Sequence, residues 1–211
     1  LRQLTLIDTP GLSTLTTEND SATRRAVIDG FEQTRTASID ADAADKAAHF
    51  IMVADSFHLP IVFFADNPGM LPGSKSERSG VLRAGARMFA AQTAATTLKL
   101  HVTLRKAYGF GSMVMSLLGF DGQEATFAFP GATMGAMSAA ALSRASHAEE
   151  DLSAKLREAE LTASFRSAGH LGFDELIDPR ETRDQLLDAL RRGLRARQAA
   201  AEPVQRTVIL P

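Results

Sequence analysis

The residues with the clearest capacity for chemistry are the backbone amides of a short segment, Tyr108-Gly109-Phe110-Gly111. The residues before it, Leu98 to Leu104, alternate as a strand does, and the apolar residues after it, Met113 to Leu118, favour a short helix. A chain that passes from strand to helix in this way places the amides of Phe110 and Gly111 near a helix N-terminus. Unpaired N–H groups and the helix dipole favour negative charge there. The pattern predicts a site for an oxyanion; the alternative is an ordinary strand-to-helix loop.

A second segment, Asp8-Thr9-Pro10-Gly11, follows a short apolar run and resembles the DxxG switch of a dynamin-like GTPase. The resemblance implies that Asp8 reaches Mg²⁺ through water and that the amide of Gly11 senses a γ-phosphate. A GTPase also needs a phosphate-binding loop, and the nearest approach, Gly69 to Ser76, lacks the second glycine and follows the switch. We therefore interpret residues 1–37 as a GTPase-like remnant or fused segment, or a poorly ordered one. A nucleotide-binding switch that uses Asp8 and Gly11 stays as an alternative function.

Side chains add little catalytic chemistry. No Ser/His/Asp constellation is evident, and none of the histidines pairs at metal-ligand spacing, so we expect no metal site. Each histidine is expected to be a surface or capping residue: His49, His58, His101, His147 and His170. Arg105 and Lys106 are either a solvated charge pair or a means of attracting negatively charged substrates.

Composition narrows the class of protein. The 211 residues are 45% hydrophobic and carry a net charge of −2, which suits one or two packed domains and does not indicate nucleic-acid binding. No apolar run approaches the roughly 20 residues that span a bilayer. Cysteine is absent, which is compatible with a cytoplasmic location. The chain begins without Met, which suggests a fragment or an excised segment.

Strand-like and helix-like segments alternate along the chain and predict an α/β fold with parallel strands and flanking helices. Strands are expected at 4–7, 59–65, 98–104 and 125–129, and helices at 22–31, about 40–57, 81–95, 113–118 and 134–145. The helix at Met134 to Ala145 is dense in small residues, so we expect it to be buried, with an oligomer interface as one setting. Two amphipathic helices finish the chain. The last is signalled by Asp178 as N-cap and Pro179 in the first turn, with a buried stripe of leucines at 186, 187, 190 and 194.

From about Ser38 onward, the chain resembles the C-terminal half of the carboxyltransferase subunits of acetyl-CoA and propionyl-CoA carboxylases. Stretches in the order typical of that family carry the resemblance: Asp40 to Ile51, Leu59 to Val62, Asp66 to Met70, Gly73 with Glu77 and Gly80, Arg83 to Ala86, Arg105 to Gly109, and Ile177 to Arg183. The resemblance implies a crotonase-like (ClpP/crotonase) carboxyltransferase domain at 38–211, separate from residues 1–37.

The resemblance also implies a reaction, in which a carboxyl group passes from carboxybiotin to the α-carbon of an acyl-CoA. Biotin would be the cofactor, borne on a biotin carboxyl carrier protein and charged by a biotin carboxylase. Two oxyanions need stabilisation, one on the thioester and one on biotin, and this half of the family serves biotin. The resemblance makes the amides of Phe110 and Gly111 the oxyanion hole for biotin. It places Gly69, Gly73, Tyr108, Gly109 and Met113 around the bound biotin or substrate.

The chain departs from the family pattern in three respects. Many relatives have Gly-Gly-Ala where this chain has Gly109-Phe110-Gly111, which is tolerable if the Phe110 side chain points away from the site. Met113 stands where relatives often carry a polar residue in the acyl pocket, which leaves an apolar or longer acyl chain open. The half that serves the CoA thioester is not in this sequence, so we expect activity to need an N-terminal half or second subunit, in a homo- or hetero-oligomer. A truncated or chimeric chain without turnover is the alternative.

Overall fold

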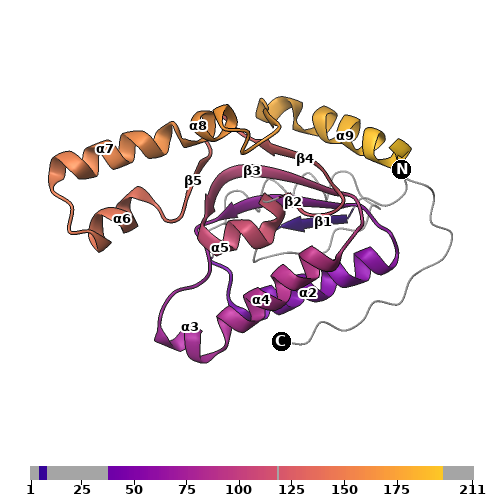
Figure 1. Cartoon of the computed structure of the whole chain (residues 1–211), viewed down its shortest axis with the longest axis horizontal. Coiled ribbons are helices and arrows are strands. Elements are labelled where there is room, and N and C mark those ends of the chain that lie inside the picture. Colours follow the sequence, from indigo (N-terminus) through magenta and orange to yellow (C-terminus); the bar gives the residue numbers. More distant parts are fainter. Residues whose placement is uncertain (1–4, 9–37, 118, 197–211) are drawn as a thin grey trace.

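A single parallel sheet with helices on both faces organises the protein (Figure 1). The structure is a computed structural model and describes residues 5–8, 38–117 and 119–196. Its strands are β1 (Thr5–Asp8), β2 (Ile61–Asn67), β3 (Lys99–Tyr108), β4 (Gln123–Ala128), β5 (Thr133–Gly135) and β6 (Glu175–Leu176). Its α-helices are α2 (Ala41–Ser56), α3 (Ser74–Arg78), α4 (Val81–Ala94), α5 (Gly109–Ser112), α6 (Ala139–Ala145), α7 (Glu150–Leu161), α8 (Ala163–Gly169) and α9 (Thr182–Ala196). A π-helical turn, Met113–Leu117, follows α5 and is called the π segment below, and a 3₁₀ turn, Pro179–Glu181, precedes α9.

The strands pair in parallel in the order β1-β2-β3-β4-β6, and β5 pairs with β3 beyond the end of β4. Strand β2 is covered on both faces. Ile61 and Phe63 pack with α2 and α4, whereas Val62 packs with residues of α9. A strand buried on both faces needs a continuous apolar sequence, which is the pattern at 59–65 that predicted it. The expected α/β fold with parallel strands is confirmed.

Helix α2 begins where the sequence predicts it. The Asp40 carboxylate accepts a hydrogen bond of 2.8 Å from the amide of Ala43, so it is the N-cap. Beyond the cap, apolar residues recur at helical spacing, and Ala44, Ala48 and Ile51 are buried against α4 and the sheet. Burial of such a face contributes about 25 cal/mol per Å² of apolar surface and holds α2 in place.

Strand β3 runs four residues further than the sequence predicts and contains an irregularity. Ala65 is level with Thr103, but Asn67 is level with Ala107, so β3 carries extra residues between these two pairs. A bulge of this kind bends the strand and changes the direction in which its end points. Beyond it, β3 exchanges β4 for β5 as its neighbour. The end of β3 therefore lies beside the end of β2.

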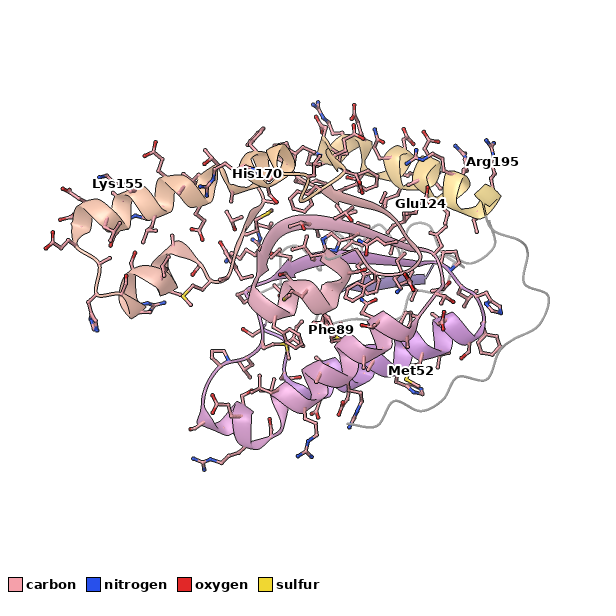
Figure 2. All side chains as sticks on the ribbon, in the orientation of Figure 1. Met52, Phe89, Glu124, Lys155, His170 and Arg195 are labelled. Atoms are coloured by element: carbon pink, nitrogen blue, oxygen red, sulfur yellow. The ribbon has the colours of Figure 1, made fainter. Side chains whose placement is uncertain are left out.

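The segment after β4 differs from the prediction. Instead of one buried helix over 134–145, β5 occupies 133–135 because the extended end of β3 offers a free strand edge, and α6 begins only after Ser138, whose hydroxyl caps it. In α6 only Ala139 is buried, so the expectation of a buried helix is wrong. Helix α7 has no buried residue, and with α6 it projects beyond the sheet, as Lys155 in Figure 2 marks.

The last helix is confirmed, with a shorter buried stripe. The Asp178 carboxylate accepts a 2.8 Å hydrogen bond from the amide of Arg180, and Pro179 opens the 3₁₀ turn. Leu190 is 2% exposed, but Leu194 is 46% exposed, and Gly193 is the residue that meets Leu98 at this end of α9. Figure 1 shows α9 on the face opposite α2 and α4.

Some expectations lie outside the described residues, among them the helix at 22–31 and the fold of most of the segment 1–37. The strand expected at 4–7 is observed as β1, which pairs with β2. None of the described helices is long and apolar enough to cross a bilayer. The division between segments 1–37 and 38–211 stays a prediction.

Candidate functional site

The carboxyl end of β3 leads directly into α5, so the helix begins at Gly109 and not at Met113 as predicted. Gly109 has φ +56°, and a Cβ there would lie 3.0 Å from the Ala136 carbonyl oxygen, so only glycine fits without strain. The amides of Phe110 and Gly111 fall in the first turn, where N–H groups have no acceptor within the helix. The structure therefore puts both amides at a helix start.

Gly111 lies against the turn that follows β2. A Cβ at Gly111 would come within 2.7 Å of the Cα and carbonyl carbon of Gly69 and of the Asn67 side-chain oxygen. These neighbours are backbone and a fully buried side chain, so they cannot move aside cheaply. Gly69 has φ +115°, and a Cβ there would lie 3.3 Å from the Tyr108 carbonyl oxygen. Two glycines thus let the Gly69 turn touch the start of α5, and the structure brings Gly69, Tyr108 and Gly111 together.

The Gly69 turn is itself held from two sides. The Asn67 Oδ1 accepts a 3.1 Å hydrogen bond from the Gly69 amide, and the Ile39 amide donates a 3.0 Å bond to the Gly69 carbonyl. The Leu71 amide donates to the Ile39 carbonyl at 2.8 Å. The surface against which Gly111 rests is therefore fixed by bonds from the preceding strand and from the segment before α2.

The half-buried Phe110 side chain packs against the edge of the core under α4. Its ring centroid is 5.9 Å from that of Phe89 on α4, and Phe89 in turn meets Phe120 edge-on at 5.5 Å. Figure 2 labels Phe89 on α4, the helix that faces α5. The ring also lies over Gly85, where a Cβ would come within 2.9 Å of the Phe110 Cε1. The side chain of Phe110, which departs from the family pattern, therefore packs against α4 and does not cover the Phe110 amide.

Tyr108 is tied to the projecting helices. Its hydroxyl donates a hydrogen bond to the Glu160 carboxylate on α7, and the same carboxylate oxygen accepts a 2.9 Å bond from the Ala139 amide on α6. Burial, reinforced by the hydrogen bond to Glu160, raises the pKa of Tyr108 to about 12, so the phenol keeps its proton at neutral pH. The hydroxyl of Tyr108 is therefore occupied by a structural bond.

The remaining predicted residues lie at different distances from this centre. Met113 is half-buried and opens the π segment directly after α5. Gly73 is exposed at the start of α3 and has no neighbour within 4 Å of an added Cβ, so the structure does not bring it to the Gly69–Gly111 contact. Arg105 forms a 2.7 Å ion pair with Asp66, which raises its pKa.

The π segment is held by side chains that the sequence did not identify. His101 was expected at the surface or at a cap, but it is fully buried in β3. Its Nδ1 lies 2.7 Å from the Met115 carbonyl oxygen and its Nε2 lies 2.7 Å from the Thr103 hydroxyl. Burial lowers the pKa of His101 to about 4, partly opposed by the bond to Met115. The ring is therefore neutral at physiological pH. The alternation of the strand, with Leu100 and Val102 on the opposite face, was the signal that His101 faces inward.

Of the two residues of the nucleotide hypothesis, the structure describes Asp8. Asp8 ends β1 and its Cα is level with Phe64 of β2, while Gly11 lies outside the described residues, so the nucleotide hypothesis is not tested. Within residues 5–8, 38–117 and 119–196, no group of three His, Asp or Glu residues is arranged to hold a metal ion.

Comparison with protein families gives a match over most of the chain. Residues 26–207 match the model of the carboxyl transferase domain. The methylmalonyl-CoA decarboxylase subunit alpha of Veillonella parvula is 36% identical over 155 residues, which cover 72% of this chain and 30% of that protein. The methylmalonyl-CoA carboxyltransferase 12S subunit of Propionibacterium freudenreichii subsp. shermanii is 35% identical over 163 residues, which cover 72% of this chain and 31% of that protein.

Solved structures agree with the sequence comparison. The structure of a transcarboxylase 12S hexamer with methylmalonyl-coenzyme A and methylmalonic acid bound superposes with a TM-score of 0.68 and 33% identity. The match covers 81% of this chain and 34% of that one. The chain thus spans about a third of the length of the curated relatives that it matches.

Proposed function

The chain belongs to the carboxyl transferase domain family, and on this premise we propose that it forms the biotin side of an acyl-CoA carboxyltransferase. In this role the amides of Phe110 and Gly111 bind the ureido oxygen of biotin. The chain takes part in the transfer of a carboxyl group from carboxybiotin to the α-carbon of an acyl-CoA. The proposal predicts one oxyanion hole in the described residues, built from main-chain donors.

The contact between Gly111 and Gly69 carries this proposal. It fixes the start of α5 against a turn that is itself bonded to Asn67 and Ile39, so the two first-turn amides have a set position. Donors that are already in place need no reorganisation when charge develops, and one such donor is worth about 3–4 kcal/mol in a transition state. The Phe110 ring supports the same interpretation because it packs toward Gly85 and Phe89.

The donor set fits the group it would hold. A ureido oxygen that gains negative charge accepts hydrogen bonds from neutral N–H groups, and the start of a helix favours that charge. Carboxybiotin, when bound, supplies the carboxyl group as CO₂ and a ureido nitrogen that takes the α-proton of the thioester. The chain's own residues orient the ureido ring and stabilise its oxygen, and no side-chain acid or base is required of them. Gly69, Gly109 and Tyr108 shape the backbone around these amides, and Gly73 and Met113 are proposed to line the outer part of the site.

The reaction has a second oxyanion, on the thioester, and we assign its stabilisation to another part of the assembly. An N-terminal half of the longer protein, or a partner subunit, would bind the acyl-CoA. Acetyl-CoA and propionyl-CoA are the proposed substrate types. The apolar side chain of Met113 favours an apolar or longer acyl group over a polar one, since a polar acyl group beside it would lose hydrogen bonds to water.

The proposed partners follow from the same scheme. A biotin carboxyl carrier protein delivers the cofactor, a biotin carboxylase charges it, and both act in the cytoplasm. Assembly into a homo- or hetero-oligomer is supported by apolar side chains that are exposed on and near the projecting helices: Met137, Leu142, Leu152, Leu161 and Phe165. Surfaces of this kind are typical of subunit contacts.

Titration of the ¹⁵N-labelled chain with biocytin, which mimics the biotinylated lysine of a carrier, tests the proposal. We expect chemical-shift changes centred on the amides of Phe110 and Gly111. The Gly111→Ala variant should lose them, whereas Gly131→Ala should keep them, since an added Cβ at Gly131 has no neighbour within 4 Å. Binding that leaves both amides unchanged would refute the assignment of the oxyanion hole.

A kinetic measurement tests whether the thioester oxyanion is stabilised by another segment or subunit. Malonyl-CoA-dependent carboxylation of free biotin should be absent with this chain alone and should appear when the acyl-CoA-binding half is supplied. Turnover by the chain alone would contradict the assignment of the thioester oxyanion to another segment or subunit.

A further inference from the structure

The π segment that follows α5 has a strained backbone at its end. Ser116 adopts φ +67°, a left-handed conformation that costs a non-glycine residue about 1–2 kcal/mol, and Met115 has φ −88° and ψ 23°. Both residues are buried, with at most 1% exposure. A strained and buried turn persists only where its surroundings hold it.

Three side chains from three different elements hold the successive carbonyls of this turn. The Gln92 amide on α4 donates to the Val114 carbonyl at 3.0 Å, and the Gln123 amide on β4 donates to the Ser116 carbonyl at 2.7 Å. Between them, the Met115 carbonyl lies 2.7 Å from the Nδ1 of His101. Carbonyls in a π-helical turn that ends in a kink lack regular helical donors, and these side chains replace them.

The chemistry of the partners fixes the tautomer of His101. A carbonyl oxygen can only accept, so Nδ1 carries the proton, and Nε2 accepts a hydrogen bond from the Thr103 hydroxyl. The ring is thus bonded on both sides in its neutral form. It connects a central strand of the sheet to the middle of the π segment through a fully buried contact.

The position of Met115 affects the amides because α5 continues without a break into the first part of the π segment. Residues 109–114 keep a helical conformation up to the kink at Met115 and Ser116, with Gly111 pressed against Gly69 near the start and Met115 held by His101 where the helical part ends. Since this helical part cannot move toward the Gly69 turn, loss of the bond at Met115 lets it relax only away from that turn.

We propose that His101 is a positioning residue that sets the location of the Phe110 and Gly111 amides through its hydrogen bond to the Met115 carbonyl. This inference rests on the proposed function only for the ligand that the amides bind. The placement of the amides by His101 is independent of that ligand and is measured without it.

Two polar substitutions separate this role from simple stabilisation. In His101→Asn the side-chain NH₂ stands near the place of Nδ1 and keeps a donor for Met115. In His101→Gln the amide reaches the place of Nε2, so it meets Thr103 and leaves Met115. Both variants lose the ring and bury an amide, so their losses of thermal stability should be similar.

The measurement is the ¹⁵N–¹H shift of Phe110 and Gly111 in the ligand-free chain, followed by the Kd for biocytin. In His101→Asn we expect wild-type shifts and a Kd within about twofold of the wild-type value. In His101→Gln we expect displaced shifts and binding that is roughly tenfold weaker than in the wild type. Equal shifts in the two variants, or wild-type shifts in both, would overturn the positioning role. If neither wild type nor variants bind biocytin but the shifts differ as expected, the proposed function fails and the positioning role stands.

Discussion

Substitution of Gly111 by alanine is the sharpest perturbation that the structure offers. The added Cβ would sit 2.7 Å from the Gly69 Cα, the Gly69 carbonyl carbon and the Asn67 Oδ1. Ordinary van der Waals contact begins near 3.4 Å, so the backbones of Gly69 and Gly111 must separate by roughly 0.7 Å. Protein interiors are close-packed and accommodate such a shift only at a cost in free energy. Overpacking of this kind costs about 1–3 kcal/mol, which for a chain of this size lowers Tm by roughly 2–12 °C.

The same separation moves the Gly111 amide relative to the Gly69 turn, so binding should suffer beyond the loss of stability. We expect the affinity for biocytin to fall at least tenfold at a temperature where the variant is fully folded. Differential scanning calorimetry and NMR titration measure the two effects separately. Gly131→Ala is the matched control, since its added methyl group meets open space. A Gly111→Ala protein with wild-type Tm and wild-type affinity would refute the close contact on which the site depends.

Other substitutions and a pH titration give further expected outcomes. Gly85→Ala should lower the free energy of unfolding by about 1–3 kcal/mol, because its Cβ would come within 2.9 Å of the Phe110 ring, which packs against Phe89 and cannot swing aside as the terminal methyl group of Met70 can; wild-type stability in urea would contradict this. Tyr108→Phe removes a bond to a carboxylate and should cost about 1–3 kcal/mol by urea unfolding, with wild-type stability as the contrary result. His101 has a folded pKa of about 4, below its unfolded value of 6.5, so its contribution is full above pH 6.5 and is lost as pH falls toward 4. The loss amounts to about 3 kcal/mol, and a His101→Asn protein should lack this part of the acid slope; equal slopes in both proteins would argue against a buried neutral ring.

The sequence predicts the elements whose signals are local. The apolar run of β2 and the Asp40 cap of α2 are confirmed because each depends on residues within one element. The predicted start of α5 was wrong, because it depends on the contact between Gly111 and Gly69. The strand β5 was not predicted, because it depends on the free edge that β3 offers. These contacts join residues that are distant in sequence, and no periodicity within a segment records them.

The candidate site shows the same limit. Glycines at 69, 109 and 111 are visible in the sequence, and the family resemblance pointed to them, but their mutual distances come from the bulge in β3. His101 was misjudged because a lone histidine is more often at a surface. The alternation of the strand sets it on the face opposite Leu100 and Val102, but the carbonyl that makes its burial possible comes from the π segment, which the strand itself does not indicate.

The attachment of helix α7 has a dynamic consequence. Helix α7 buries none of its residues, and its Glu160 carboxylate joins Tyr108 at the end of β3 to the start of α6. A segment with so little buried surface opens as a small cooperative unit well before the sheet does. Amides of α7 should therefore exchange with solvent deuterium through local opening, at rates that track the Tyr108–Glu160 bond and not the global free energy of unfolding. Each such opening releases the side chain at the last position of β3, one residue before the helix that presents the two amides.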